Sequence, residues 1–111
     1  MADYNDFAKI DIRAGVITKA EVFERAKNPA YKVWVDFGPE LGIKASSAQI
    51  TQHYAVSELV GKAVLGVVNI GQRNIAGFVS EFLLLGLPDA KGHIRLATYD
   101  HDASLLGARL C

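Results

Sequence analysis

The sequence contains one cysteine, Cys111, and lacks long apolar runs. A single thiol cannot form a disulfide within the chain, so a reducing compartment such as the cytoplasm fits best, and we expect Cys111 to be a solvated thiol. No apolar stretch approaches the ~20 residues that a membrane-spanning helix needs. Asp3 and Asp6 lie where a signal peptide would be basic and then apolar. We therefore expect a cytoplasmic protein without membrane insertion.

An excess of charge of either sign is also missing, because 12 basic and 12 acidic side chains balance one another. Proteins that bind nucleic acid without selectivity usually carry a strong basic excess, so the balance argues against that class. It is compatible with a local basic patch. In residues 41–80, Lys44, Lys62 and Arg73 are offset only by Glu58.

The motifs of common enzymes are missing as well. Hydrolytic chemistry needs a nucleophile beside a histidine and a carboxylate, whereas His53, His93 and His101 are scattered in the sequence without a nucleophile elbow. There is no phosphate-binding loop and no dinucleotide fingerprint. The one cluster of metal-ligand types, residues 100–102, is better explained as a solvated turn. We expect no catalytic residue, no metal and no cofactor.

Hydrophobic residues make up 50% of the chain, enough for one domain of residues 1–111 with a core of its own. Apolar and polar residues alternate from Tyr31 to Phe37, which is typical of a strand with one buried face. Ile17 breaks the alternation of an earlier strand next to Gly15, which predicts either a β-bulge or a sharp coil of the strand at that glycine. Similar patterns predict five strands, at residues 10–23, 31–37, 43–50, 62–70 and about 79–85.

Two short helical segments complete the prediction. Residues 2–9 place Tyr4 and Phe7 three apart, as on one face of a helix. Residues 51–61 are expected to form helical turns between the third and fourth strands. Thr51 and Ser57 are candidate N-caps of these turns, and Gly61 is a candidate for the position after the C-cap.

Three strands, a small helix and two more strands are the element order of the OB-fold, a five-stranded, partly open Greek-key barrel. We therefore predict an all-β OB-fold barrel formed by about residues 9–87. The N-terminal helix and a C-terminal extension, residues 88–111, are additions to this barrel.

An OB-fold binds ligands on the face of its second and third strands, between the loop after the first strand and the loop after the fourth. In this chain those loops are residues 23–30 and 69–81. The second loop is longer than a hairpin requires. It carries a cation at Arg73, an amide at Asn69 and an aromatic ring at Phe78. Such groups suit a stacked base or a peptide segment. The alternative for Phe78 is packing in the core.

Three stretches, KIDIRAGVI, YKVWVDFGPELGIKASSAQIT and NIAGFVSEFLLLG, resemble the CsaA family of secretion chaperones, a branch of the OB-fold tRNA-binding domains. The similarity runs from about Phe7 to Leu87. The resemblance implies a homodimer without enzymatic activity that holds precursor polypeptides for export, with the export machinery as a further partner. It also implies the alternative function of a structure-specific tRNA-binding protein.

The resemblance implies a set of binding residues too. The family's signature positions fall on Ser46, Ser47, Gln49, Arg73, Gly77, Phe78, Ser80 and Glu81. If RNA is the ligand, we also expect Arg13 and Lys44 to contact phosphates. The tRNA-binding relatives have glycine and methionine after the last serine, whereas this chain has Glu81 and Phe82. An acid therefore stands beside the expected RNA surface.

The tail contains leucines that have no place in a five-stranded barrel, namely Leu105, Leu106 and Leu110. Trp34 alternates onto the outer side of its strand, and tryptophan is common at interfaces. With Tyr4 and Phe7, these residues predict a two-fold interface between copies of the chain. The alternative for Trp34 is a place in the peptide groove. A third functional hypothesis is an interaction module that serves only in a larger assembly.

Overall fold

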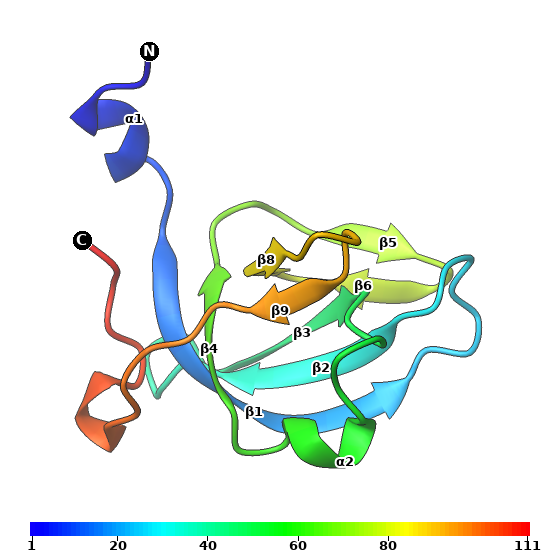
Figure 1. Cartoon of the computed structure of the whole chain (residues 1–111). Helices are drawn as coiled ribbons and strands as arrows, with labels where there is room; N and C mark the ends of the chain where they lie inside the picture. Colours follow the sequence, from blue (N-terminus) through cyan, green and yellow to red (C-terminus); the bar gives the residue numbers. More distant parts are fainter.

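The barrel is the centre of the molecule (Figure 1). In a computed structural model that describes residues 1–111, five antiparallel strands form one sheet in the order β3-β2-β1-β4-β7. These strands are β1 (Ile12–Val22), β2 (Tyr31–Asp36), β3 (Ile43–Ala48), β4 (Ala63–Val67) and β7 (Leu83–Leu84). The predicted all-β, OB-like barrel is confirmed.

Two hairpins and three short helical segments are added to the barrel. The hairpins pair β5 (Arg73–Ile75) with β6 (Phe78–Ser80), and β8 (Gly86–Pro88) with β9 (Ile94–Leu96). The helices are α1 (Tyr4–Ala8), α2 (Val56–Leu59) and the 3-10 turn η1 (Ala103–Leu105). None of the helices is long and apolar enough to cross a membrane.

Strand β2 shows how the sequence pattern builds the core. Its alternate residues Tyr31, Val33 and Val35 are all buried, whereas Lys32 and the other outward residues are only half-buried. The inward residues join a cluster whose other buried members are Ile17, Phe37, Ile50, Leu59, Val64 and Phe82. A period of two therefore predicted the buried face of this strand correctly.

The bulge in β1 lies three residues later than predicted. The register against β2 shifts between Ile17 and Lys19, so the extra residue is Thr18 and the expectation of a bulge at Gly15 is wrong. Gly15 is needed for close packing, because a β-carbon there would lie 2.5 Å from Cγ1 of Val35 and 2.9 Å from Cδ1 of Phe37. Ile17, two residues after Gly15, lies on the same face and is 1% exposed. The extra residue Thr18 changes the phase of the strand beyond it, so that Ala20 packs against the core.

The caps of α2 differ from the prediction. Its N-cap is Ala55, so Thr51 and Ser57 do not cap it. Alanine has no side-chain acceptor for the first-turn N–H groups, but the carboxylate of Glu58 accepts a hydrogen bond from the Ala55 N–H at 2.8 Å, which is the reciprocal half of a capping box. Gly61, with φ of +92°, follows the C-cap as predicted.

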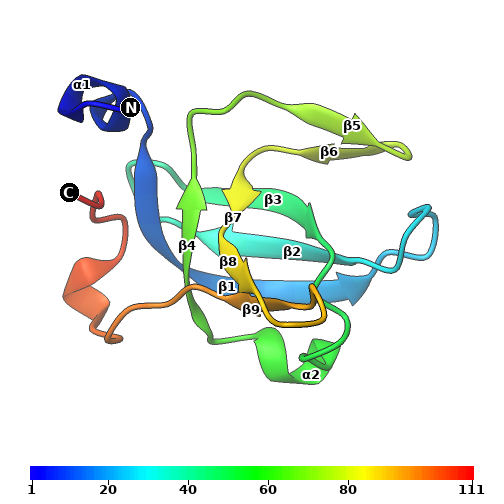
Figure 2. The same cartoon turned by 45° about the horizontal axis from the view of Figure 1, so that its top comes forward.

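The loop predicted at residues 69–81 is an ordered hairpin, β5–β6, that we call the arm. Ala76 and Gly77 both have positive φ, 50° and 85°, and form its two-residue turn. The single strand predicted at 79–85 is broken into β6 and β7, because the chain between them turns inward and buries Phe82 against Phe37, with ring centroids 5.1 Å apart. Figure 2 shows the arm extending alongside β3.

The tail is hydrogen-bonded to the barrel. The Ala14 N–H donates to the carbonyl of Ala108 at 2.9 Å, and the N–H groups of Gly107 and Leu110 donate to Ala14 and Ile12, both at 2.8 Å. The first half of β1 pairs with β4 on its other side. The tail therefore covers a strand edge that β2 leaves free.

Candidate ligand-binding groove

A groove with a volume of about 740 Å³ runs beneath the arm. It lies between the loop after β1 and the arm, the two elements that border the binding face of an OB-fold. Its lining comes from residues 26–30, residues 47–50 with Gln52, Arg73 and Ile75 of the arm, residues 83–86, and residues 92–94 of the β8–β9 turn. The two loops that the sequence singled out therefore border one groove.

The groove lining combines apolar and hydrogen-bonding groups. Nine of its 19 residues are hydrophobic, including Ile75, Ile94 and the leucines of β7. Arg73 provides a cation, and Gln49 adds an amide that can donate and accept hydrogen bonds. Such a lining can take apolar side chains while it bonds the backbone of an extended peptide, or it can contact a base and its phosphate.

One face of the arm points toward the barrel. Arg73 is paired with Ser80, and Ile75 with Phe78, so these four side chains share a face. Ser80 is buried and Phe78 half-buried, whereas Val79 of the opposite face is exposed. Arg73 and Ile75 thus reach the groove because Phe78 and Ser80 hold the arm down.

An aromatic cluster fastens the arm. The Phe78 ring meets Phe23 edge-on at 5.5 Å and Trp34 at 5.9 Å between centroids. The Lys32 ammonium lies 5.0 Å and 5.1 Å from the Phe23 and Phe78 rings, and Lys19 lies 4.7 Å from the Trp34 ring. Phe78 therefore packs on the outer side of β2 and is not a member of the buried core cluster, so the alternative of core packing is wrong. Trp34 lies beneath the arm.

The signature serines divide into two groups. Ser46 and Ser80 are 2% and 9% exposed, and their hydroxyl oxygens lie 3.1 Å apart. The Ser46 hydroxyl also donates to the carbonyl of Phe82 at 2.8 Å, which ties β3 to the base of the arm. Ser47 and Gln49, in contrast, line the groove.

Glu81 is engaged at the edge of β3. Its carboxylate accepts the Ala45 N–H at 3.0 Å, and its own N–H donates to the Ala45 carbonyl at 2.7 Å. These bonds nearly close the barrel between β3 and the arm. The acid that follows Ser80 therefore has a structural partner in β3.

Of the predicted binding residues, Ser47, Gln49 and Arg73 line the groove. The others lie outside the lining, namely Ser46, Gly77, Phe78, Ser80, Glu81, Arg13, Asn69 and Lys44. Arg13 bonds Asp11 at 2.7 Å and the carbonyl of Gly107 at 3.0 Å; the bond to Asp11 raises the pKa of Arg13. Asn69 accepts the Asp11 N–H and donates to the Lys9 carbonyl, at 2.9 Å and 2.8 Å. Both residues thus fix the junction of α1, β1 and the tail. Lys44 is half-buried on β3.

An apolar patch lies on α1 and the tail, where three of the predicted interface residues, Tyr4, Phe7 and Leu110, meet. We define this end patch by Tyr4, Phe7, Ile10 and Leu110, which are 78%, 38%, 44% and 42% exposed. They line a shared hollow of about 250 Å³. Leu105 is exposed nearby in the sequence, while Leu106 is half-buried and lines a different hollow.

Residues 12–107 match a family model described as "Putative tRNA binding domain". The chain is 36% identical over 93 residues to the methionine–tRNA ligase of Porphyromonas gingivalis and 33% identical over 100 residues to that of Methanocaldococcus jannaschii. These matches cover 84% and 90% of the chain but only 13% and 15% of the ligases. The similarity is therefore confined to a small part of those enzymes.

Two crystal structures resemble the chain over its whole length. A CsaA chaperone protein from Picrophilus torridus is 43% identical with a TM-score of 0.92, and the match covers 100% of both chains. A chaperone CsaA from Bacillus anthracis is 41% identical with a TM-score of 0.90, covering 100% of this chain and 99% of the other.

Proposed function

The chain belongs to the family of tRNA-binding domains and, within it, to the CsaA type, and on this premise we propose that it is a non-enzymatic chaperone that binds unfolded or precursor polypeptides. The observation that carries the proposal is the groove beneath the arm, where apolar side chains and Arg73 lie side by side. We place its action in the cytoplasm, with client polypeptides on their way to export and the export machinery as partners.

The proposed binding mode is weak and unselective. Burial of a few hundred Å² of apolar surface yields several kcal/mol at roughly 25 cal/mol per Å², before the cost of ordering the peptide. This suits a protein that must release its client. The sequence carries no nucleotide-binding motif to drive that release, so we propose that clients leave by simple dissociation.

The second candidate function is binding of structured tRNA. It is supported by the family match and by the cations beside the groove, Lys27 and Arg73. Because the net charge is zero, such binding would have to rest on RNA shape and on a few phosphate contacts.

Substitution of Ile75 tests the groove directly. In an aggregation assay on a denatured client protein, we expect the wild-type protein to suppress light scattering without added nucleotide. Ile75→Asp places a charge in the apolar lining and should lose most of that suppression. Ile43→Asp, at an exposed isoleucine outside the lining, is the matched control. Equal suppression by the two variants would contradict the groove as the polypeptide site.

We further propose that the end patch forms a two-fold interface between copies of the chain. Exposed apolar residues from α1 and the tail lie together there, a composition typical of interfaces between identical chains. Arg109 fixes their relative position, since its guanidinium donates to the Ala8 carbonyl at 2.8 Å. Trp34 packs with Phe78, which favours its alternative role at the groove.

Light scattering on Phe7→Asp tests this interface. A carboxylate in the end patch should convert dimers into monomers, because an unpaired charge would be buried. Removal of the tail is a poorer test, since it would also strip the hydrogen bonds that cover β1. Val60→Asp, at another exposed apolar residue, should leave the mass unchanged. A dimer that survives Phe7→Asp would show that the interface lies elsewhere.

A further inference from the structure

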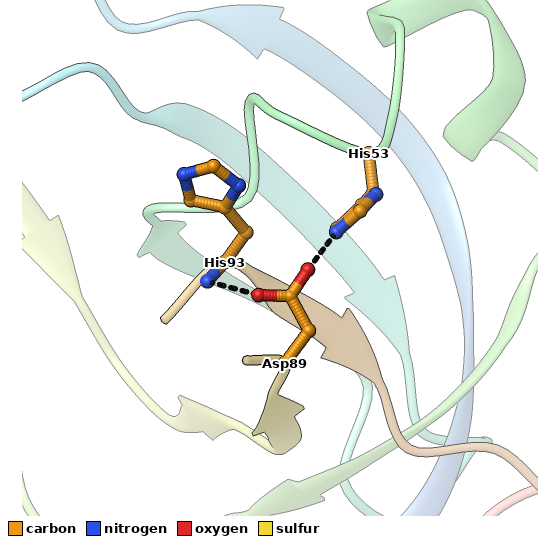
Figure 3. Close-up of side chains that lie close together, drawn as sticks. All are labelled: His53, Asp89 and His93. Atoms are coloured by element: carbon orange, nitrogen blue, oxygen red, sulfur yellow. Dashed lines mark hydrogen bonds and ion pairs between the residues drawn. The ribbon is translucent and has the colours of Figure 1, made fainter. Parts of the chain in front are cut away.

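Three side chains that can bind metals converge beside the groove (Figure 3). His53 lies in the turn after β3, while Asp89 and His93 belong to the β8–β9 turn. One potential ligand atom from each lies within 4.8 Å of the others. His53 Nε2 is 2.7 Å from Asp89 Oδ2, and the centroids of the two imidazole rings are 6.0 Å apart.

The carboxylate of Asp89 is held in place by the backbone. Its Oδ1 accepts the N–H groups of Lys91 and His93, both at 2.9 Å. The hydrogen bond from His53, together with these backbone bonds, lowers the pKa of Asp89 to about 2. With Oδ1 held by the backbone, Oδ2 of Asp89 is directed at His53 (Figure 3).

From this juxtaposition we propose that His53, Asp89 and His93 bind a divalent transition-metal ion such as Zn²⁺. Two imidazoles and one carboxylate are a common ligand set for Zn²⁺, with bonds of about 2.0–2.2 Å that leave a fourth position open. Ligand atoms bound to one tetrahedral ion lie about 3.3 Å apart. His53 Nε2 and Asp89 Oδ2, now 2.7 Å apart, would therefore separate slightly to admit the ion between them, while the His93 nitrogen, which lies within 4.8 Å of both, completes the set. The side chains of His53 and Asp89 are 21% and 31% exposed, so an ion can reach them from solvent.

The position of the cluster gives a metal ion a structural consequence. The ion would join the turn after β3 to the β8–β9 turn, and His93 itself lines the groove. It would thus brace one end of the groove wall. This inference rests on the three side chains and stands whether the groove binds polypeptides or tRNA.

Cobalt titration of the protein, prepared without a histidine tag, tests the proposal. We expect about one Co²⁺ per chain with the visible absorption of a four-coordinate site, displaced by Zn²⁺, and a melting temperature raised by either metal. His93→Ala and His53→Gln should each weaken binding at least ~10-fold, as expected when a ligand is lost. The matched control is His101→Ala, because His101 is an exposed histidine outside the cluster.

Melting in the presence of a chelator separates loss of metal binding from loss of folding. His93→Ala should melt cooperatively with chelator present and gain no stability from Zn²⁺. If either His93→Ala or His53→Gln is poorly folded, metal binding by the other variant tests the proposal. The proposal is overturned if the wild-type protein binds no metal, or if the cluster variants and His101→Ala bind it equally well.

Discussion

Replacing Phe78 by alanine is expected to weaken the binding of an unfolded polypeptide roughly 5- to 150-fold, equivalent to about 1–3 kcal/mol. The ring joins the arm to Phe23 and Trp34, at 5.5 Å and 5.9 Å between centroids. Without it, the inner face of the arm loses its support, and Arg73 and Ile75 are no longer fixed over the groove. Peptide anisotropy titrations measure the change in affinity.

Stability must be measured in the same experiment. A fully buried phenylalanine typically costs ~3–5 kcal/mol when truncated to alanine. Phe78 is only half-buried, so a loss of about 1–3 kcal/mol is expected. Phe78→Leu keeps most of the apolar volume and should recover much of both losses. If Phe78→Ala melts earlier but its folded fraction binds peptide normally, Phe78 serves only to pack the arm, and the groove does not depend on it.

The fold was predictable from the sequence where one side of a strand is buried. The alternation from Tyr31 to Phe37 and the order of strands and helix are enough to predict the OB-fold barrel, because burial of one face imposes a period of two. The bulge lies three residues after the predicted position, because a glycine inside a strand usually indicates a bulge and Gly15 does not. In the structure it instead provides room for Val35 and Phe37.

The arm could not be predicted from its turn. Two-residue hairpins are usually signalled by Asn-Gly or Asp-Gly, whereas this turn is formed by Ala76 and Gly77, and alanine rarely adopts positive φ. The nearby Asn74 is the missed signal, because its side chain accepts the Gly77 N–H at 2.9 Å. Without that signal, the polar residues around Asn74 predict a loop where the structure has a hairpin.

The candidate site was predictable by segment more than by residue. Both loops that border the groove were identified, and Ser47, Gln49 and Arg73 line it. The hydroxyl groups of Ser46 and Ser80 form a hydrogen bond with each other in the interior, and no local sequence pattern predicts such a contact. His53 and Asp89 meet only because the β8–β9 hairpin folds back onto the turn after β3, a contact between residues 36 positions apart.

Replacing Arg73 by glutamate is expected to lower tRNA affinity more than ~10-fold at low salt. Arg73 is exposed and lines the groove, so the substitution puts a negative charge where a phosphate would approach. Peptide binding should fall less, because most of its free energy comes from apolar contacts. Filter-binding and anisotropy titrations on one preparation compare the two ligands.

Arg95→Glu is the matched control for charge. Arg95 is exposed on β9 and is not part of the groove lining, yet its reversal changes the net charge by the same amount. It should lower tRNA affinity only slightly. If both reversals weaken tRNA binding equally, the effect is long-range electrostatics and Arg73 has no local role.

The central claim is that the groove holds polypeptides mainly by apolar contact, and the salt dependence of binding tests it most directly. Affinities of the wild-type protein for an unfolded peptide and for tRNA would be measured between 50 mM and 200 mM salt. We predict a change of less than about threefold for the peptide, whereas tRNA held by about three phosphate contacts would lose roughly 20- to 40-fold. Absence of peptide binding, or a peptide affinity that falls as steeply as that of tRNA, would contradict the account.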